Sequence, residues 1–306
     1  MKKIHLLIFA LASILFSCNE SIDYEQFEKK VLITKNGWVE QEIYLDSTNV
    51  TVPFVVSVNG TTGNSENVKV QVSEYSDTLN QYNFEKYRYD SLLYYTQLPA
   101  ETYSLDRNIT IPAGEVKGVG GIRLNIDAIS DIYADYVLPL AITSTSAYQI
   151  AKNSYSSTLL HLIFKNSFSG SYSGKMTMYK TNSNGSNDTS NKIEVSTVTL
   201  YALTHKQCYM YAGNYSRGSS ARNKFIINIE NDNGMLTLSS PNPDIQLKQE
   251  SATIEVSESN SITDNRYKIV STTLTFRYTY IDLGDITKPT LRAEGTISMN
   301  RDNVLK

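Results

Sequence analysis

Few side chains in this sequence could perform acid–base or metal chemistry. Of the 3 His residues, His5 lies in an apolar N-terminal segment, which leaves His161 and His205. His205 and Cys208 are three residues apart, and an odd separation on a strand places side chains on opposite faces, so no Cys–His pair is expected. His161 lies within an apolar run and is expected to be a hydrogen-bonded core or edge residue. The sequence has neither an HExxH motif nor paired cysteines at a metal-binding spacing, so no metal or cofactor is predicted.

Three further patterns share features with catalytic sites. Residues 170–174 have the glycine spacing of a nucleophile elbow, but the central residue is Tyr rather than Ser. Asp131 with Asp135, and Asp282 with Asp285, could supply the two acids of glycoside hydrolysis. Both pairs lie in apparent loops, where solvated turn acids are far commoner. No catalytic residue is assigned, and the chain is predicted not to be an enzyme.

Tyrosine is the abundant residue type that could bind a ligand: the chain has 22 Tyr but 9 Phe and 1 Trp. Sugar rings present apolar C–H faces that stack on aromatic planes, and a phenol adds a hydrogen bond at the rim. Tyrosine is also ordinary in strands, so the candidates are those that cluster outside regular alternation. These candidates are Tyr87, Tyr89, Tyr94 and Tyr95 in one segment, and Tyr209, Tyr211 and Tyr215 beside Arg217 in another.

The N-terminus has the pattern of an export signal. Lys2 and Lys3 precede an apolar run over 6–16 that is too short to span a bilayer. The run ends in Leu-Phe-Ser-Cys, which resembles the lipobox of bacterial lipoproteins, in which the Cys is acylated and becomes the new N-terminus. Residues 1–17 are therefore predicted to be a signal peptide and Cys18 the lipidation site.

Residues 18–30 are acid-rich and resemble the surface-export leader of Bacteroides-type lipoproteins. They are expected to tether an outer-membrane lipoprotein that faces the cell exterior. A tether extended to Lys30 could hold the first domain about 40 Å from the membrane. No later run reaches eighteen apolar residues, so membrane attachment is expected through the lipid alone. With Cys18 lipidated, Cys208 remains alone and no intramolecular disulfide is predicted.

Composition limits the class of protein and of partner. Of the 306 residues, 41% are hydrophobic, which suffices for one or two packed cores. The 28 Lys and Arg against 31 Asp and Glu give a net charge of −3. Without a basic excess to neutralise a phosphate backbone, nucleic acid is not expected as a partner.

Residues 31–165 are predicted to form an immunoglobulin-like β-sandwich. Apolar residues alternate with polar ones along several short segments, such as 50–58, 68–72 and 122–126, which is the period of strands with one buried face. Residues 159–164 are apolar on both faces, as expected of a central strand. The segment Thr78 to Tyr95 is the exception and is expected to be a short helix or an ordered crossover.

Residues 166–306 are predicted to form an antiparallel, lipocalin- or calycin-like β-barrel. The polar stretch 166–174 is expected to be a hinge. About eight longer strands follow with short turns between them, including the hairpin turn Asn-Asp-Asn-Gly at 231–234. Because the mouth of a barrel or an adjoining loop is a usual place for a ligand, Tyr209 to Arg217 is the preferred site, with Tyr94 and Tyr95 as the second candidate. Trp38 is expected to be a core residue or an interdomain anchor.

The chain resembles surface lipoproteins of Bacteroides-type glycan-utilisation loci. The residues that carry the resemblance are LPAETYSL at 98–105, ITIPAG at 109–114, YVLPLAI at 136–142, GSYSG at 170–174 and RAEGTISM at 292–299. The first domain of such proteins is Ig-like and also occurs ahead of family-18 endo-β-N-acetylglucosaminidase modules. The resemblance implies carbohydrate capture at the cell surface, with an outer-membrane transporter and glycosidases as partners, and it brings no catalytic residue.

Two alternatives from other classes stay open. In one, the protein is structural or binds host proteins, and the sandwich is a spacer. In the other, the barrel holds a small apolar ligand, as lipocalins do. An exposed row of aromatic residues with polar neighbours would favour glycan, whereas a closed apolar cavity would favour the small ligand.

Overall fold

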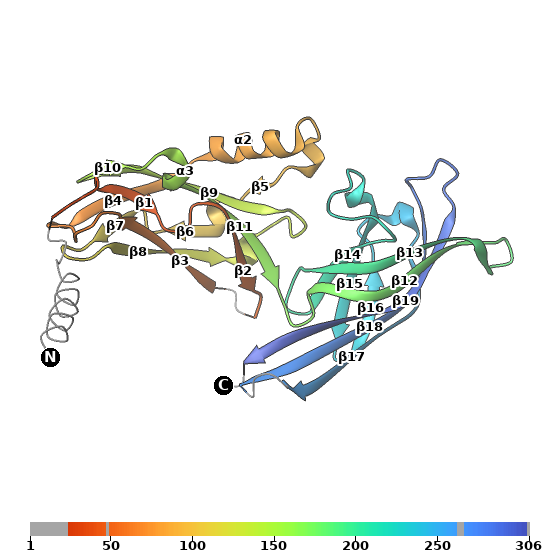
Figure 1. The fold of residues 1–306 in the computed structure, drawn as a ribbon. Coiled ribbons are helices and arrows are strands. Elements are labelled where there is room, and N and C mark those ends of the chain that lie inside the picture. Colours follow the sequence, from red (N-terminus) through yellow and green to blue (C-terminus); the bar gives the residue numbers. More distant parts are fainter. Residues whose placement is uncertain (1–23, 47–48, 262–265, 305–306) are drawn as a thin grey trace, which may run out of the picture.

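The structure is a computed structural model that describes residues 24–46, 49–261 and 266–304. It is an all-β protein with 57% strand and 11% helix, in which a β-sandwich is followed by a closed antiparallel barrel of eight strands. The two domains lie end to end (Figure 1). The predicted fold class is therefore confirmed. The predicted signal peptide 1–17 and the lipidation site Cys18 lie outside the described residues and stay predictions.

The sandwich consists of two sheets. The first contains, in order, β10 (Gln149–Ile150), β1 (Lys30–Ile33), β3 (Asn49–Val58), β8 (Lys117–Asn125) and β6 (Tyr103–Leu105). The second contains β2 (Gly37–Tyr44), β11 (Ser157–Lys165), β9 (Tyr136–Thr145), β4 (Val68–Glu74) and β7 (Asn108–Ile111), and β5 (Thr96–Gln97) pairs with β9. Short helices η1 (Ser91–Leu93), η2 (Ala100–Thr102), η3 (Ile126–Ala128) and α3 (Asn153–Ser156) connect them.

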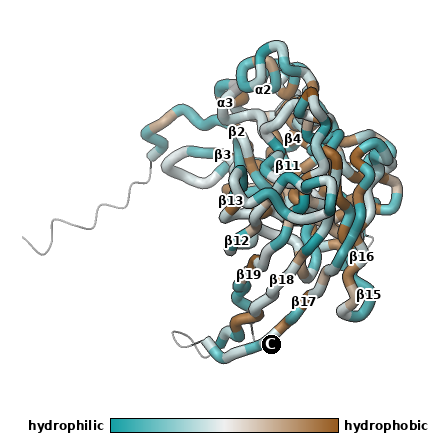
Figure 2. Tube along the Cα trace, turned by 90° about the vertical axis from the view of Figure 1, so that its right-hand side faces the viewer, coloured by the Kyte–Doolittle hydropathy of each residue, from teal (hydrophilic) through white to brown (hydrophobic). Residues whose placement is uncertain are grey.

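Alternating apolar residues build the core between these sheets. Val68, Val70 and Val72 of β4 are buried, whereas the polar residues between them are exposed. Apolar positions alternate with hydrophilic ones along the strands (Figure 2). Strand β11 lies between β2 and β9, which confirms the prediction of a central strand. Apolar side chains on both of its faces are needed because both faces are covered.

Helix α2 (Ser76–Tyr87) covers the outer face of the second sheet, which confirms the helix expected in this segment. Leu79 of the helix is buried against Val137 of β9 and Leu159 of β11. The helix ends at Arg88, whose φ of 55° takes the chain out of the helical region. The chain then returns to the sheet through η1.

The barrel is an up-and-down meander in which each strand pairs with the next and the last pairs with the first. Its strands are β12 (Gly170–Thr181), β13 (Asn187–Ala202), β14 (Gln207–Tyr211), β15 (Ile226–Asp232), β16 (Met235–Ser239), β17 (Lys248–Asn260), β18 (Tyr267–Ile281) and β19 (Thr290–Val304). Short helices η4 (Arg222–Phe225) and η5 (Pro243–Ile245) close two of its loops. The hairpin predicted at 231–234 joins β15 to β16, with Asn233 and Gly234 at positive φ, as a tight two-residue turn requires.

Large side chains fill the interior of the barrel. The bulkiest of its fully buried residues are Tyr172, Phe225, Phe276, Tyr278 and Tyr280. Their rings occupy the space in which a lipocalin-like barrel would hold a ligand. The described residues of the interior therefore give no support to the alternative of a small apolar ligand.

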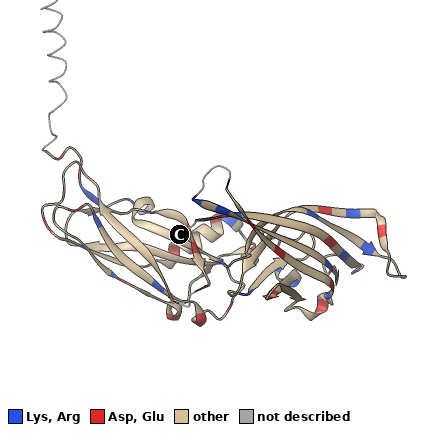
Figure 3. Cartoon of the chain, turned by 90° about the horizontal axis from the view of Figure 1, so that it is seen from below, with Lys and Arg blue, Asp and Glu red and all other residues tan. Residues whose placement is uncertain are grey.

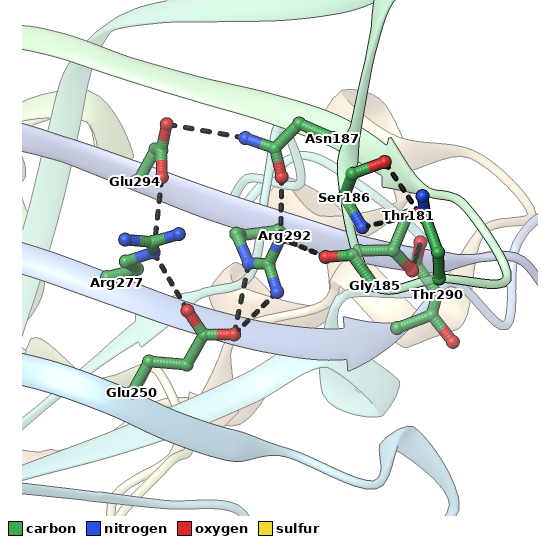
Figure 4. Close-up of polar contacts among 10 residues, drawn as sticks. Thr181, Gly185, Ser186, Asn187, Glu250, Arg277, Thr290, Arg292 and Glu294 are labelled. Carbon is green, nitrogen blue, oxygen red and sulfur yellow. Dashed lines mark hydrogen bonds and ion pairs between the residues drawn. The ribbon is translucent and has the colours of Figure 1, made fainter.

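Charged residues of both signs are distributed along the chain in both domains (Figure 3). On the barrel, Arg292 donates to Glu250 at 3.0 and 2.8 Å, and Arg277 lies 2.8 Å from Glu250 and 3.3 Å from Glu294 (Figure 4). Arg292 also donates to the side chain of Asn187 at 2.6 Å. This network joins side chains of β17, β18 and β19 and connects them to Asn187 at the start of β13. It therefore ties the β12–β13 hairpin to the neighbouring strands.

The connector between the domains is a buried structure rather than the polar hinge that the sequence suggested. Asn166 donates to the carbonyls of Thr204 and Gln207 at 2.7 and 2.9 Å. Its Oδ1 accepts from the amides of Phe168 and Ser169 and from the Cys208 thiol. Arg301 donates to the carbonyls of Asn166 and Ser169. Asn and Ser are polar here because they pair with the backbone, not because they face water.

The described part of the leader, residues 24–30, folds onto the sandwich instead of extending from it. The Glu25 carboxylate accepts from the backbone amides of Thr61 and Thr62 at 2.7 and 3.2 Å and lies 3.4 Å from Lys29 Nζ. The Thr61 amide in particular lowers the pKa of Glu25 strongly. The loop that holds Glu25 follows β3 at the end of the sandwich remote from the barrel (Figure 1). An extended tether up to Lys30 is therefore not observed.

The connector predicts a large effect of a small substitution. Asn166→Ala is expected to lower the free energy of unfolding by about 3 kcal/mol, because it leaves several buried backbone groups without partners. Chemical denaturation measures this change. Ser167→Ala, next to it but exposed, is the matched control and is expected to change stability by less than about 0.5 kcal/mol. Equal stability of the two variants would contradict this account.

Candidate functional site

The two tyrosine segments singled out in the sequence meet at one place, the junction between the domains. We define the junction by segment 88–95, which follows α2, and loop 212–225, which joins β14 to β15. Ser220 Oγ donates to Asp90 Oδ2 at 2.5 Å, which links the two segments directly. They also lie side by side in the ribbon view (Figure 1). The fold therefore gathers candidates that are more than 100 residues apart in the sequence.

An ion pair between the domains lies beside this contact. Arg217 Nε donates to Asp135 Oδ2 at 2.5 Å. The backbone carbonyl of Asp135 accepts from the amide of Thr96, so Asp135 belongs to the same edge of the sandwich as segment 88–95. The Arg217 guanidinium also lies 5.0 Å from the ring centroid of Tyr201. Burial lowers the pKa of Arg217 to about 10, at which the guanidinium is still charged at neutral pH.

Tyr209 and Tyr211 are packing residues of the junction. Tyr209 stacks on Tyr201 at 5.0 Å and meets Tyr133 of the sandwich edge to face at 5.4 Å. The Tyr133 hydroxyl is hydrogen-bonded to Asn228 of the barrel. Tyr209 exposes 3% of its surface and Tyr211 8%. Rings covered in this way have no free face for a sugar, so their role as ligand contacts stays a prediction that this packing does not favour.

Tyr215 is the most accessible ring of the barrel segment, but it also has fixed partners. It stacks on Phe225 at 3.7 Å, and its hydroxyl donates to Asp282 at 2.8 Å. Tyr211 and Tyr215 line a groove of about 160 Å³. Ligand pockets usually begin at about 300 Å³, so this groove could take only the edge of a ligand.

Beneath α2, an inner aromatic cluster contains Trp38, Tyr82, Tyr95 and His161. Trp38 stacks on Tyr82 with centroids 4.6 Å apart, and it lies 4.8 Å from Tyr95 and 5.0 Å from His161. Trp38 is thus an anchor between helix and sheet. Tyr95, one of the predicted site residues, is half-buried within this cluster.

His161 differs from its expected environment. It exposes 4% of its surface, but neither ring nitrogen has a hydrogen-bond partner, and its nearest acid is Glu40, 3.9 Å from Nδ1. The expectation of a hydrogen-bonded histidine is therefore wrong. Burial lowers the pKa of His161, and the opposing effect of Glu40 is smaller. The imidazole is held neutral between aromatic rings.

Free aromatic faces occur at the end of α2. We name Phe84, Tyr87, Tyr89, Leu92 and Tyr94 the aromatic tip. Tyr89 exposes 91% of its surface, Leu92 62% and Phe84 45%. Phe84 and Tyr89 meet edge to face at 6.0 Å, while Tyr87 and Tyr94 are half-buried with centroids 6.4 Å apart. The Tyr94 hydroxyl donates to the carbonyl of Arg88 at 2.5 Å, which fixes the turn.

The sequence reasoning missed Phe84 and Lys86 at this tip. Both lie on α2, and the i, i+4 spacing of Tyr82 and Lys86 was a signal that could have placed the lysine beside the rings. Elsewhere, Cys208 is fully buried, and burial raises the pKa of its thiol to about 12. In the part of the chain that the structure describes, no three His, Cys, Asp or Glu residues are arranged to hold a metal ion.

Two family models match the chain. Residues 24–146 match a domain of unknown function, DUF4973, and residues 156–298 match a model described as a C-terminal domain. No curated protein matches. Within the described residues, no helix has the length and apolar character needed to cross a membrane.

Several solved structures share the fold over most of their length. A protein of unknown function from Bacteroides ovatus is 24% identical, with 90% of this chain and 95% of that chain covered and a TM-score of 0.78. A multidomain protein including DUF1735 from the same organism is 23% identical, with 89% and 95% covered and a TM-score of 0.77. An auxiliary nutrient binding protein from Bacteroides thetaiotaomicron is 21% identical, with 86% and 91% covered and a TM-score of 0.73. At these identities the likeness shows the fold alone.

The packing of Tyr209 predicts a structural phenotype. Tyr209→Ala is expected to lower the free energy of unfolding by about 3 kcal/mol, because it opens a cavity among the rings of the junction. Tyr209→Phe keeps the ring and is the matched control, with an expected loss below about 1.5 kcal/mol. Thermal or chemical unfolding distinguishes the two. A stable Tyr209→Ala variant would show that the ring is not needed for packing.

His161 predicts a pH dependence of stability. Its pKa in the folded protein lies below the unfolded value of about 6.5, so below pH 6.5 the unfolded chain binds a proton that the folded chain does not. This group's contribution to stability is therefore complete above about pH 6.5 and is lost progressively as the pH falls below it.

His161→Phe is expected to flatten the decline in unfolding free energy between pH 7 and pH 5. His205→Phe, at an exposed position, is the control that should keep the slope of the original protein. Denaturant titrations at several pH values measure both slopes. An unchanged slope in His161→Phe would contradict the neutral, buried state of this histidine.

Proposed function

We propose that this protein is a non-catalytic, lipid-anchored surface protein that binds glycan for a carbohydrate-uptake system. The observation that carries the proposal is the aromatic tip, where Tyr89 is almost wholly exposed beside Phe84, Tyr87 and Tyr94. Exposed rings cost free energy in water unless a ligand covers them, and sugar C–H faces fit such rings. The polar residues Lys86, Arg88 and Asp90 lie between the tip residues along the chain, and a hydroxyl-rich ligand needs such partners.

The comparisons add support for a binding role. One protein of the same fold is described as an auxiliary nutrient binding protein. The sequence resemblance to lipoproteins of glycan-utilisation loci points in the same direction. We therefore propose an outer-membrane transporter and neighbouring glycosidases as the partners to which captured glycan passes.

The geometry of the leader fits an anchored protein. Glu25 fixes the described leader at one end of the sandwich, and the barrel and the junction lie toward the other end (Figure 1). For a chain acylated at Cys18, this arrangement turns the junction away from the membrane. We propose the outer membrane as the location, with the protein facing the cell exterior.

A protein partner is the second candidate function. Leu92 exposes 62% of its surface and adjoins the aromatic residues of the tip. Clusters of exposed apolar and aromatic side chains are also typical of protein interfaces. A structural or host-interaction role would use the same surface, and glycan binding distinguishes the two.

Tyr89→Ala is expected to weaken glycan binding about tenfold, a loss of about 1.4 kcal/mol, because the most exposed ring of the tip is removed. The secreted chain with Cys18→Ser would first be screened on an array of mucin, N-linked and plant glycans, and each hit would then be measured by calorimetry.

Tyr155→Ala is the matched control, since Tyr155 is also exposed but lies on α3. If Tyr89→Ala binds glycan with undiminished affinity, the binding site does not include Tyr89 and lies outside the tip. Absence of binding to any glycan at high concentration would favour the protein-interaction alternative.

A further inference from the structure

We infer, on the basis of the proposed function, that the glycan bound at the aromatic tip is acidic and that Lys86 and Arg88 bind its anionic group. The anionic group would be a carboxylate or a sulfate on the sugar. Lys86 lies 5.3 Å from the ring centroid of Tyr87 and Arg88 lies 5.7 Å from that of Phe84, so a sugar bound on the tip would bring an anionic group near either cation.

Lys86 is held in place by phenols rather than by an acid. Its Nζ lies 3.1 Å from the Tyr95 hydroxyl and 3.4 Å from that of Tyr82. The ring centroids of Trp38, Tyr82, Tyr87 and Tyr95 lie 5.0 to 5.4 Å from it. An ammonium has three donors, and two are directed at hydroxyls, so the third is available to an anionic oxygen.

The acids nearest in the sequence have other partners. Glu85 accepts from the Gln81 amide at 2.7 Å, and Asp90 accepts from Ser220. In the ranges that the structure describes, no carboxylate is recorded in an ion pair with Lys86 or Arg88; their recorded partners are the phenols and rings. Other cations of the sandwich, such as Arg107 and Arg123, are paired with Glu74 and Asp106. Among the described residues, the two cations next to the tip thus have no recorded carboxylate partner, in a chain whose net charge is −3.

Arg88 supplies an independent observation. Its φ of 55° and ψ of −112° are unfavourable for a residue with a side chain, and glycine would be favoured there. The guanidinium lies 5.7 Å from the ring centroid of Phe84, and Phe84 in turn meets exposed Tyr89 edge to face. Strained backbone persists where function requires a particular side chain, and here that side chain is a cation among free rings.

A structural role must be separated from this one. Lys86 and Arg88 lie at the C-terminal end of α2, where positive charge stabilises a helix. A helix-stabilising role would alter unfolding but would not make binding depend on the charge of the ligand. The test therefore compares each acidic ligand with a partner that lacks the anionic group under test.

The experiment uses the secreted chain with Cys18→Ser and calorimetry on matched ligand pairs. Two pairs test a carboxylate: polygalacturonic acid is compared with its methyl ester, and sialyllactose is compared with lactose. A third pair, chondroitin sulfate and desulfated chondroitin, tests a sulfate. We expect at least one acidic member to bind tenfold or more tightly than its neutral or less charged partner. This preference should decline as salt is raised from 50 to 500 mM.

Two variants locate the anionic contact. Lys86→Gln is expected to reduce the affinity for the acidic ligand about tenfold and to leave the affinity for the neutral ligand unchanged. Arg88→Gly is also expected to reduce the affinity for the acidic ligand alone. The protein should lose no stability, because glycine accepts the backbone angles at this position. Lys117→Gln, an exposed lysine at the far end of the sandwich, is the control and should retain the preference.

Each outcome decides between the two proposals. Equal affinity for both members of every pair overturns the acidic ligand but leaves glycan binding intact. Equal losses for acidic and neutral ligands in Lys86→Gln and Arg88→Gly also overturn it, since they indicate a structural effect. Binding to no glycan of either kind overturns both proposals.

Discussion

The arrangement of this molecule depends on the pairing of Asn166 with the backbone of the barrel. A buried amide whose donors and acceptor are all used fixes the direction in which the chain leaves β11 and enters β12. Arg301 of the last strand closes the same structure from the other side. The buried, hydrogen-bonded connector thus helps to hold loop 212–225 of the barrel against segment 88–95 of the sandwich, where Ser220 is bonded to Asp90.

Within that junction, tyrosines of similar sequence context have opposite roles. Tyr209 lies where the two domains press together, and its ring is covered by Tyr133 and Tyr201. Tyr89 lies beyond the last turn of α2, where nothing in the described chain covers it. The tyrosine surplus is therefore the sum of a structural set and an exposed set. Only the exposed set is suited to a ligand, because stacking needs a free face.

Local pattern predicted much of the fold, including the central strand β11, helix α2, the hairpin at 231–234 and the sequential order of the barrel strands. Each depends on which face of an element is apolar, and the sequence records that directly. It does not record what covers the face. Contacts between segments far apart in the chain were therefore not predicted. They decide the burial of Tyr209, the lack of a hydrogen-bond partner for His161 and the burial of the connector at 166–169. The exposed Tyr89 was named only as one of several tyrosines for the same reason.

The docked leader determines the reach of an anchored molecule. Because Glu25 is bound to the loop after β3, residues 25–30 are part of the folded sandwich and add no length to a tether. If the chain is anchored at Cys18, as we propose, the folded domain rather than residues 25–30 sets how far the aromatic tip reaches from the lipid. A reach fixed by folded structure would favour ligands that project from their own attachment into that distance, so an anchored protein would select ligands by length as well as by chemistry.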